Sequence, residues 1–225
     1  MQEKTTPEQQ KKELQVTLAK FAHELRNPMS LIQSELQLMA SHHPEVASFD
    51  HWDSIQENLE HVRELLDELT KYNNAGQFSP TPTDTAAFLK HIAVSFKPSL
   101  DYLGIRLDVR IPDTLPALAL DQTKIRQAFL NVLRNAQESI HHSHGVITLS
   151  ASAVPGGVSV TIRDNGCGMT KAQLQNIYRP FVTYKPSGTG LGLSVTRQII
   201  EAHGGSLDVQ SAPEKGTSFR IFLRG

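Results

Sequence analysis

The first third of the chain carries two runs of apolar residues at helical heptad spacing. Over residues 14–39 they recur every three or four positions, with one extra residue between Leu25 and Met29. Over residues 52–69 steps of three and four alternate without interruption. This spacing predicts two amphipathic helices, each with a single apolar stripe.

The segment between these runs predicts a turn, so we expect a helical hairpin over residues 1–74. The segment contains Pro44 and ends near Ser48 and Asp50, either of which is a typical N-cap for the second helix. A hairpin with one stripe per helix cannot bury both stripes by itself. We therefore expect a homodimer in which two chains form a four-helix bundle.

Periodicity and composition change after the hairpin. Residues 75–83 contain glycine, serine and proline, which predicts a linker. Residues 84–225 then mix helical and strand patterns, which predicts an α+β domain with a mixed sheet. Helices are expected at about 84–102, 121–141, from about 170, and 191–203. Strands are expected at 105–111, 146–154, 158–164, 206–211 and 217–223.

Charge and composition limit the classes of partner and location. With 22 basic and 23 acidic residues the net charge is −1, so the chain has no broad basic field for nucleic acid or an anionic membrane. There is no apolar run of about 18 residues, so no inserted segment is expected. The single cysteine, Cys167, excludes an internal disulfide and fits a reducing compartment. We expect a cytoplasmic chain, or the cytosolic portion of a larger protein.

Two motifs in the second half carry groups suited to a nucleotide. Asn131 and Asn135 are four apart and share a helical face, and an amide oxygen is a ligand suited to Mg²⁺ that also binds a triphosphate. Asp164 directly follows a predicted strand and can accept a hydrogen bond from the exocyclic amine of adenine. Gly166 and Gly168 let the backbone approach a flat base.

A third motif is the glycine-rich loop before the last predicted helix. Gly188, Gly190 and Gly192 can offer successive backbone N–H groups to phosphate oxygens at a helix start. Each motif alone is often only a turn or a solvated helix face. The three together, in this order, predict an ATP site.

The stretch FAHELRNP gathers hydrogen-bonding groups on one turn of the first helix. His23 lies between stripe positions and is expected to face solvent, where its Nε2 can attack a γ-phosphate. Glu24 can hold Nδ1–H and fix the tautomer. Asn27 lies one turn along the same face, and Arg26 can screen the charge of a phosphorylated histidine. Pro28 predicts a bend in the helix.

These motifs together closely resemble the catalytic core of a bacterial sensor histidine kinase. FAHELRNP resembles the H box of that family, NVLRNA the N box, DNGCGM the G1 box, IYRPFVTYK the F box, GTGLGL the G2 box and KGTSF the closing glycine motif. The resemblance runs from about residue 10 to the end and is nearest to sporulation- and nitrogen-type kinases. It implies a HisKA-type dimerization and phosphotransfer hairpin followed by a Bergerat-type ATP-binding domain, an α/β sandwich.

The resemblance also implies the roles of individual residues. His23 would be phosphorylated by ATP and pass the phosphoryl group to an aspartate of a response-regulator receiver domain, with Glu24 assisting. Asn27 would position a water for dephosphorylation of the regulator, and Asn135 would bind Mg²⁺. The nucleotide-binding set implied by the family is Asn131, Asn135, Asp164, Gly166, Gly168, Lys185, Gly188, Thr189, Gly190, Leu191 and Gly192.

Two other functions stay open at this point. One is a phosphotransfer or scaffold protein whose ATP-binding domain is not catalytic, although Asn135, Asp164 and the loop glycines are all intact. The other is an ATPase that performs mechanical work, which Asn131 disfavours because gyrase-type ATPases carry a water-activating glutamate there. The resemblance further implies a phosphorelay whose signal comes from a sensor domain or regulatory protein outside this chain.

Overall fold

The computed structural model describes residues 7–185 and 188–225, with side chains from Val16 onward. The chain divides into two compact units, residues 1–74 and residues 75–225. Within the described residues, no helix is long and apolar enough to span a bilayer.

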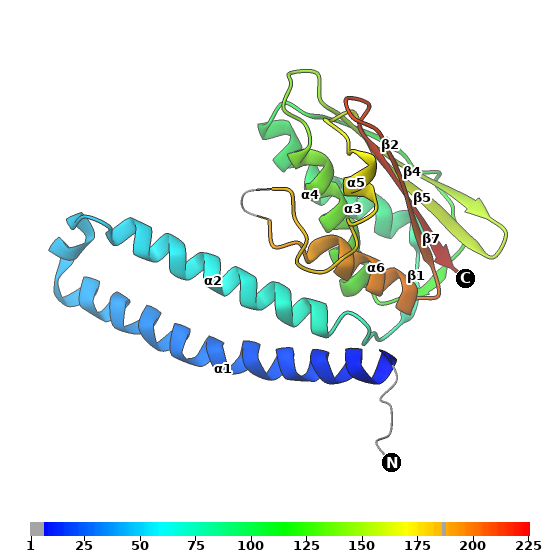
Figure 1. The fold of residues 1–225 in the computed structure, drawn as a ribbon. Helices are drawn as coiled ribbons and strands as arrows, with labels where there is room; N and C mark the ends of the chain where they lie inside the picture. Colours follow the sequence, from blue (N-terminus) through cyan, green and yellow to red (C-terminus); the bar gives the residue numbers. More distant parts are fainter. Residues whose placement is uncertain (1–6, 186–187) are drawn as a thin grey trace, which may run out of the picture. The chain divides into compact units, whose positions relative to one another are not determined.

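The first unit is a helical hairpin, as predicted. Helices α1 and α2 run antiparallel and side by side, joined by a short 3₁₀ helix, η1 (Figure 1). Helix α1 continues through Pro28. The bounds are α1 Pro7–His42, η1 Pro44–Ser48 and α2 Trp52–Asn73.

The start of α2 differs from the prediction. Neither Ser48 nor Asp50 is the N-cap; that position belongs to His51, whose φ of 73° lies in the left-handed region and whose side chain makes no capping bond. The hydroxyl of Ser48 instead donates to the carbonyl of Glu45 over 2.7 Å. The 3₁₀ helix uses residues 44–48, so α2 begins later than the capping residues suggest.

Much of the predicted apolar stripe is exposed in the single chain. Phe21 is 57% exposed and Leu25 50% exposed, whereas Ala22 and Leu66 are buried between the helices. Further exposed stripe residues are Ile32 and Met39 on α1 and Ile55 and Val62 on α2. The hairpin therefore leaves uncovered an apolar surface of the kind that a second hairpin covers in a bundle.

The second unit is built on a five-stranded mixed sheet in the order β2-β4-β5-β7-β6. Strands β2 and β4 are parallel, and the other neighbouring pairs are antiparallel. The strands are β2 Arg106–Arg110, β4 Val146–Val154, β5 Gly157–Asp164, β6 Ser206–Ser211 and β7 Thr217–Arg224. The mixed sheet that the sequence predicts is confirmed.

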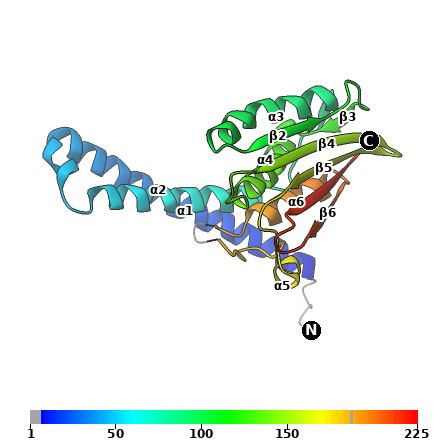
Figure 2. The same cartoon turned by 90° about the horizontal axis from the view of Figure 1, so that it is seen from above.

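Helices α3, α4 and α6 lie on one face of this sheet, which makes a two-layer α/β sandwich (Figures 1 and 2). Asp84 and Asp121 cap α3 and α4, because each carboxylate accepts a backbone N–H from the first turn. The helices are α3 Thr85–Tyr102, α4 Gln122–Glu138, α5 Lys171–Leu174 and α6 Gly192–Ala202. The layers enclose fully buried side chains that include Leu89, Ile92, Phe129, Leu133, Ile147, Leu149, Ile162 and Ile199.

Two short strands were not predicted, β1 (Thr81–Thr83) and β3 (Leu118–Leu120). They pair antiparallel in a separate small sheet. Pro82 lies within β1, and a proline argues against a strand in sequence reasoning because it donates no ladder bond. The predicted linker 75–83 thus falls in the second unit, and its last residues form a strand there.

The segment before β1 is anchored to the second unit through His203. The backbone N–H of Ser79 donates to the Asp121 carboxylate over 3.0 Å, and the ring of Phe78 lies 4.6 Å from the His203 ring, centroid to centroid. His203 in turn accepts the Asp121 backbone N–H on Nε2 at 3.1 Å, and its Nδ1 lies 2.8 Å from the Ile199 carbonyl. Nδ1 therefore carries the proton, and the imidazole is neutral in this arrangement.

Candidate functional site

The carboxylate of Asp164 lies at the end of β5, where three donors meet one of its oxygens. Oδ1 accepts the backbone N–H of Gly166 at 2.9 Å, the Ser139 hydroxyl at 3.1 Å and the backbone N–H of Thr217 at 3.1 Å. Among the described residues no donor reaches Oδ2. The carboxylate is thus fixed in orientation and keeps one oxygen for an exocyclic amine.

Burial raises the pKa of Asp164 above the usual range of an aspartate, although the donors from Gly166, Ser139 and Thr217 oppose the shift. The side chain is almost fully buried, at 4% exposed. Gly166 is required beside it, because a Cβ there would overlap the side chain and carbonyl of Ser139. This corner can accept only a flat group that brings its own hydrogen-bond donor.

The two asparagines of α4 make different contacts. Asn131 donates from Nδ2 to the carbonyl of Gly192 over 3.1 Å, and Thr196 donates to the same carbonyl over 2.9 Å. Asn131 therefore joins α4 to the first turn of α6. Asn135, one turn further along α4, accepts a hydrogen bond on Oδ1 from the ammonium of Lys185 at 2.6 Å.

The glycine-rich loop leads into the N-terminus of α6. Gly190 has a φ of 72°, and a Cβ there would lie 2.6 Å from the backbone of Phe181 and Val182. The hydroxyl of Thr189 accepts the backbone N–H of Leu191 at 3.3 Å, and the Leu191 side chain is buried. Gly192 is the first residue of the helix. The loop thus brings its backbone to the N-terminus of α6, a helix of eleven residues. An anion is favoured at such a helix end.

A cation fits the group of oxygens on this face of α4. The Lys185 ammonium contacts Asn135 Oδ1 and also forms an ion pair with Glu138, three residues further along the helix. A neutral amide oxygen is a hard ligand that suits Mg²⁺ together with phosphate oxygens and water. The side chains present therefore fit the magnesium ion that the sequence predicts at Asn135.

The residues predicted for phosphotransfer lie in the other unit, on α1. His23 is exposed and makes no hydrogen bond or ion pair with any residue the structure describes. Glu24 does not hold its ring here, since its carboxylate lies 3.8 Å from the ammonium of Lys20. Asn27 is exposed one turn after His23. An exposed imidazole whose ring nitrogens have no partner among the described residues can attack a phosphoryl group in line when another domain presents that group.

Arg26 makes contacts with α2 that the sequence did not predict. Its guanidinium donates to Asp67 Oδ1 at 2.9 Å and to Thr70 Oγ1 at 3.0 Å, both on α2. These bonds tie α1 to α2 next to the histidine. In this arrangement Nη2 of Arg26 is bonded to α2, and its role in screening a phosphate stays a prediction.

Sequence reasoning missed three residues of the second unit that contact predicted ones. Ser139 and Thr217 orient Asp164, and Glu138 contacts Lys185. Glu138 and Ser139 lie three and four residues after Asn135, so their nearness to the predicted motif could have identified them as part of the site. Thr217 lies 53 positions from Asp164, and only strand pairing brings it there.

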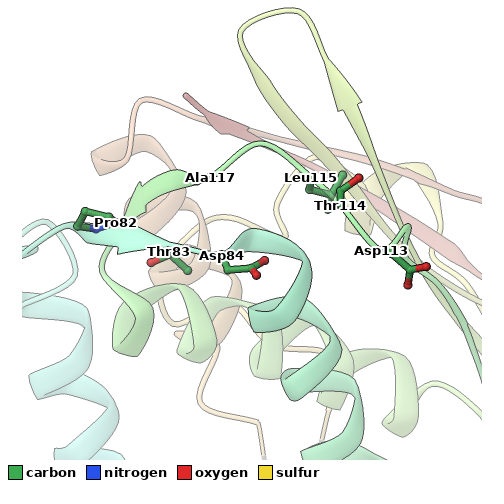
Figure 3. A pocket seen from close by; sticks show the side chains of 7 residues that line it. All are labelled: Pro82, Thr83, Asp84, Asp113, Thr114, Leu115 and Ala117. Atoms are coloured by element: carbon green, nitrogen blue, oxygen red, sulfur yellow. The ribbon is translucent and has the colours of Figure 1, made fainter.

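A separate open hollow of about 360 Å³ lies where β1 meets α3. Figure 3 shows Thr83 and Asp84 on one side of it and Thr114 and Leu115 on the other. Its described lining contains none of the predicted nucleotide-binding residues. The hollow is therefore distinct from the groups around α4.

The comparisons with known proteins agree with this arrangement. Residues 120–225 match the family described as histidine kinase-, DNA gyrase B-, and HSP90-like ATPase. Sensor histidine kinase ZraS of Escherichia coli K12 is 31% identical over 91% of this chain and 44% of its own length. Sporulation kinase B of Bacillus subtilis 168 is 30% identical over 91% of this chain and 48% of its own length. The chain thus spans less than half the length of these kinases.

Two solved structures share the fold. Full-length ShkA, crystallised with AMPPNP, superposes with a TM-score of 0.71 over 93% of this chain and 46% of its own, at 24% identity. The catalytic domain of histidine kinase ThkA superposes with a TM-score of 0.59 over 65% of this chain and 96% of its own, at 26% identity. With its helical hairpin, its match to the ATPase family over residues 120–225 and its similarity to sensor histidine kinases along nearly its whole length, this chain has the sequence and fold of a sensor histidine kinase catalytic core.

Proposed function

We propose that the chain is an ATP-dependent protein-histidine kinase that phosphorylates itself on His23 and passes the phosphoryl group to an aspartate of a response-regulator receiver domain. The observation that carries the proposal is a pair of complementary sites in one chain. An exposed, unpaired histidine lies on α1, and an ATPase-family domain holds Asp164, Asn135 and the glycine-rich loop around one helix.

In this proposal the second unit binds ATP. Asp164 accepts the adenine amine on Oδ2, while Gly166 and Gly168, having no side chain, let the loop beside it pack against Ser139 and Ala212. The loop from Gly188 to Gly192, with Thr189, Gly190 and Leu191, presents backbone N–H groups to the phosphates at the start of α6. Asn135 binds Mg²⁺, and Asn131 holds the α6 N-terminus in register with α4 through Gly192. The magnesium ion supplies charge neutralisation at the transferred phosphoryl group.

The first unit provides the nucleophile. Nε2 of His23 attacks the γ-phosphorus, the bond from that phosphorus to the β,γ-bridging oxygen breaks, and ADP leaves. Glu24 can accept Nδ1–H only after it leaves Lys20 and changes rotamer. The Lys20–Glu24 pair is solvent-exposed and weak, so that change requires little free energy. Asn27 is placed one turn away on the same face, which supports a second role in positioning water for dephosphorylation of the regulator.

We also propose that the working unit is a homodimer. The exposed stripe of Phe21, Leu25, Ile32 and Met39 on α1, with Ile55 and Val62 on α2, is the surface that a second hairpin would cover. A sensor domain or a regulatory protein outside this chain would supply the signal, since the relatives are about twice as long.

The test is incorporation of label from γ-labelled ATP with Mg²⁺, followed by acid and base treatment of the protein. We expect acid-labile, base-stable label on the wild type and none on His23→Gln. His42→Gln is the matched control, because His42 is an exposed histidine in the last turn of the same helix and should keep full labelling. Label that persists in His23→Gln would remove His23 as the acceptor. ATP binding without any label would favour the scaffold function instead.

A further inference from the structure

Lys185 occupies the position that the proposed function gives to a divalent cation. Its ammonium lies 2.6 Å from Asn135 Oδ1 and forms an ion pair with Glu138. These two groups are three residues apart on α4 and so share a face of the helix. Lys185, which the family resemblance places in the nucleotide-binding set, therefore points at the oxygen proposed to bind the cation.

The backbone around Lys185 is arranged to hold this contact. Its N–H donates to the Thr183 hydroxyl at 3.2 Å, and its carbonyl accepts a hydrogen bond from the same hydroxyl at 3.4 Å. The backbone of Lys185 is thus bonded to Thr183, and its side chain extends to α4. Glu138 supplies the only full negative charge that the described contacts bring to this ammonium.

The two cations oppose each other at this oxygen. Asn135 Oδ1 has two lone pairs, of which the Lys185 ammonium occupies one, so the conflict with a metal on the other is one of charge. Magnesium binds oxygen at about 2.0–2.1 Å and requires near-octahedral geometry, which a second positive centre at hydrogen-bond distance from the same oxygen would oppose. Entry of the metal at Asn135 therefore favours departure of the Lys185 ammonium.

We propose that Lys185 and Mg²⁺ compete for Asn135, and that Glu138 is the positioning residue that keeps the lysine there in the nucleotide-free protein. Binding of magnesium with the nucleotide releases the ammonium, which is then available to the phosphate oxygens. By linkage, the lysine weakens magnesium binding by the same factor that magnesium weakens the lysine contact. This inference rests on the proposed nucleotide site at Asn135.

The size of the effect follows from the exposure of the pair. The side chains of Lys185 and Glu138 are 40% and 50% exposed, so the contact is that of a partly screened surface ion pair. Such pairs contribute at most about 1 kcal/mol, which corresponds to about a fivefold change in an equilibrium constant. We therefore expect shifts of about three- to fivefold.

The experiment measures binding of ADP to the full chain at a series of free Mg²⁺ concentrations. ADP is used because it lacks the γ-phosphate, and the readout is the Mg²⁺ requirement and not the affinity for ADP, which a lysine contact to the remaining phosphates could change. In Lys185→Met, the Mg²⁺ concentration for half-maximal enhancement of ADP binding should fall about three- to fivefold. In Glu138→Gln it should also fall, because the lysine loses its charged partner. Lys171→Met, at an exposed lysine of α5, should match the wild type.

The possible results distinguish failure of the proposed magnesium site from failure of the proposed competition between Lys185 and Mg²⁺. If ADP binding by the wild type does not depend on Mg²⁺, the proposed magnesium site fails, and this inference fails with it. If the wild type shows that dependence but Lys185→Met is unchanged, only the competition is overturned. A higher Mg²⁺ requirement in Glu138→Gln would also overturn it, because Glu138 would then be a ligand of the metal and not a holder of the lysine.

Discussion

The two units of this chain bury their apolar residues in different ways. In the second unit the sheet and three helices enclose Phe129, Ile147 and Ile199 without any exposed area. In the first unit the largest stripe side chains, Phe21 and Leu25, are at least half exposed. The second unit therefore completes its core within one chain, whereas the hairpin needs another surface to do so.

The largest effect is expected where the hairpin meets its proposed second copy. Phe21→Glu should convert the dimer to monomer, because a symmetric dimer loses two buried phenylalanines, about 3–6 kcal/mol in all, and gains two buried charges. Sedimentation at several protein concentrations measures this change. Val94→Glu, an exposed apolar position of the second unit, should leave the oligomeric state as it is. A wild type that is monomeric at all concentrations would contradict the proposal that a second hairpin covers the exposed stripe.

A comparable loss of stability, but with no dependence on protein concentration, is expected in the second unit. Phe129→Ala leaves a cavity in a closed core and should lower the free energy of unfolding of that unit by about 3–5 kcal/mol. Urea denaturation with a probe of the second unit measures it. Tyr102→Ala removes a side chain that is 91% exposed and should stay within about 0.5 kcal/mol of the wild type. Equal losses would show that Phe129 is not part of a closed core.

A smaller effect is expected from the bonds that close the hairpin itself. Arg26→Met should destabilise the first unit by about 1 kcal/mol or less, because the Arg26–Asp67 pair is part-exposed and screened. A double-mutant cycle with Asp67→Asn isolates the pair from other contacts. Lys20→Met, which removes only the looser pair with Glu24, should change stability less. A coupling energy of zero between Arg26 and Asp67 would show that the bond does not hold the helices.

The smallest effects are expected from pH, and they have opposite signs at two aspartates of the second unit. Burial raises the pKa of Asp164, so its contribution to stability is fully present below the unfolded pKa and is lost as pH rises through the folded one. At Asp121 burial also raises the pKa, but hydrogen bonds from the backbone N–H groups of Ser79, Lys124 and Thr123 lower it by more. The pKa of Asp121 therefore lies below the usual range of an aspartate. Its contribution is present above the unfolded pKa and is lost as pH falls through the folded one.

Asp164→Asn and Asp121→Asn test these signs by urea denaturation between neutral and acidic pH. As pH falls, the wild type should gain stability relative to Asp164→Asn and lose it relative to Asp121→Asn. Parallel changes in both variants would contradict the assignment of opposite shifts.

The sequence predicted the parts of the fold that repeat a local pattern. Strands 146–154 and 206–211 have the predicted bounds, because alternating side chains mark strands that face helices on one side only. It failed at β1, where Pro82 hides a three-residue edge strand, and at α2, where a left-handed His51 and not a polar side chain starts the helix. Those features depend on what the rest of the chain places beside them.

The same division holds at the site. Asp164 and Asn135 were found from motifs, because the chemistry of one residue and its neighbours suffices to suggest a role. The contact of Thr217 with Asp164, and that of Lys185 with Glu138, join residues 53 and 47 positions apart. No local pattern contains such a pair, so the partners that orient the predicted residues came only from the fold.

The anchor of Phe78 on His203 and of Ser79 on Asp121 has a consequence for how the two proposed sites meet. Helix α2 ends at Asn73, so only residues 74–77 connect it to that anchor. The five Cα-to-Cα steps from residue 73 to residue 78, each of at most about 3.6 Å, give a tether of at most about 18 Å. In the proposed kinase, reaction within one dimer is intramolecular, so the length of this tether contributes to the effective concentration of bound ATP at His23. Release of Phe78 would lengthen the tether to the start of β1 and would lower that concentration without changing either proposed site.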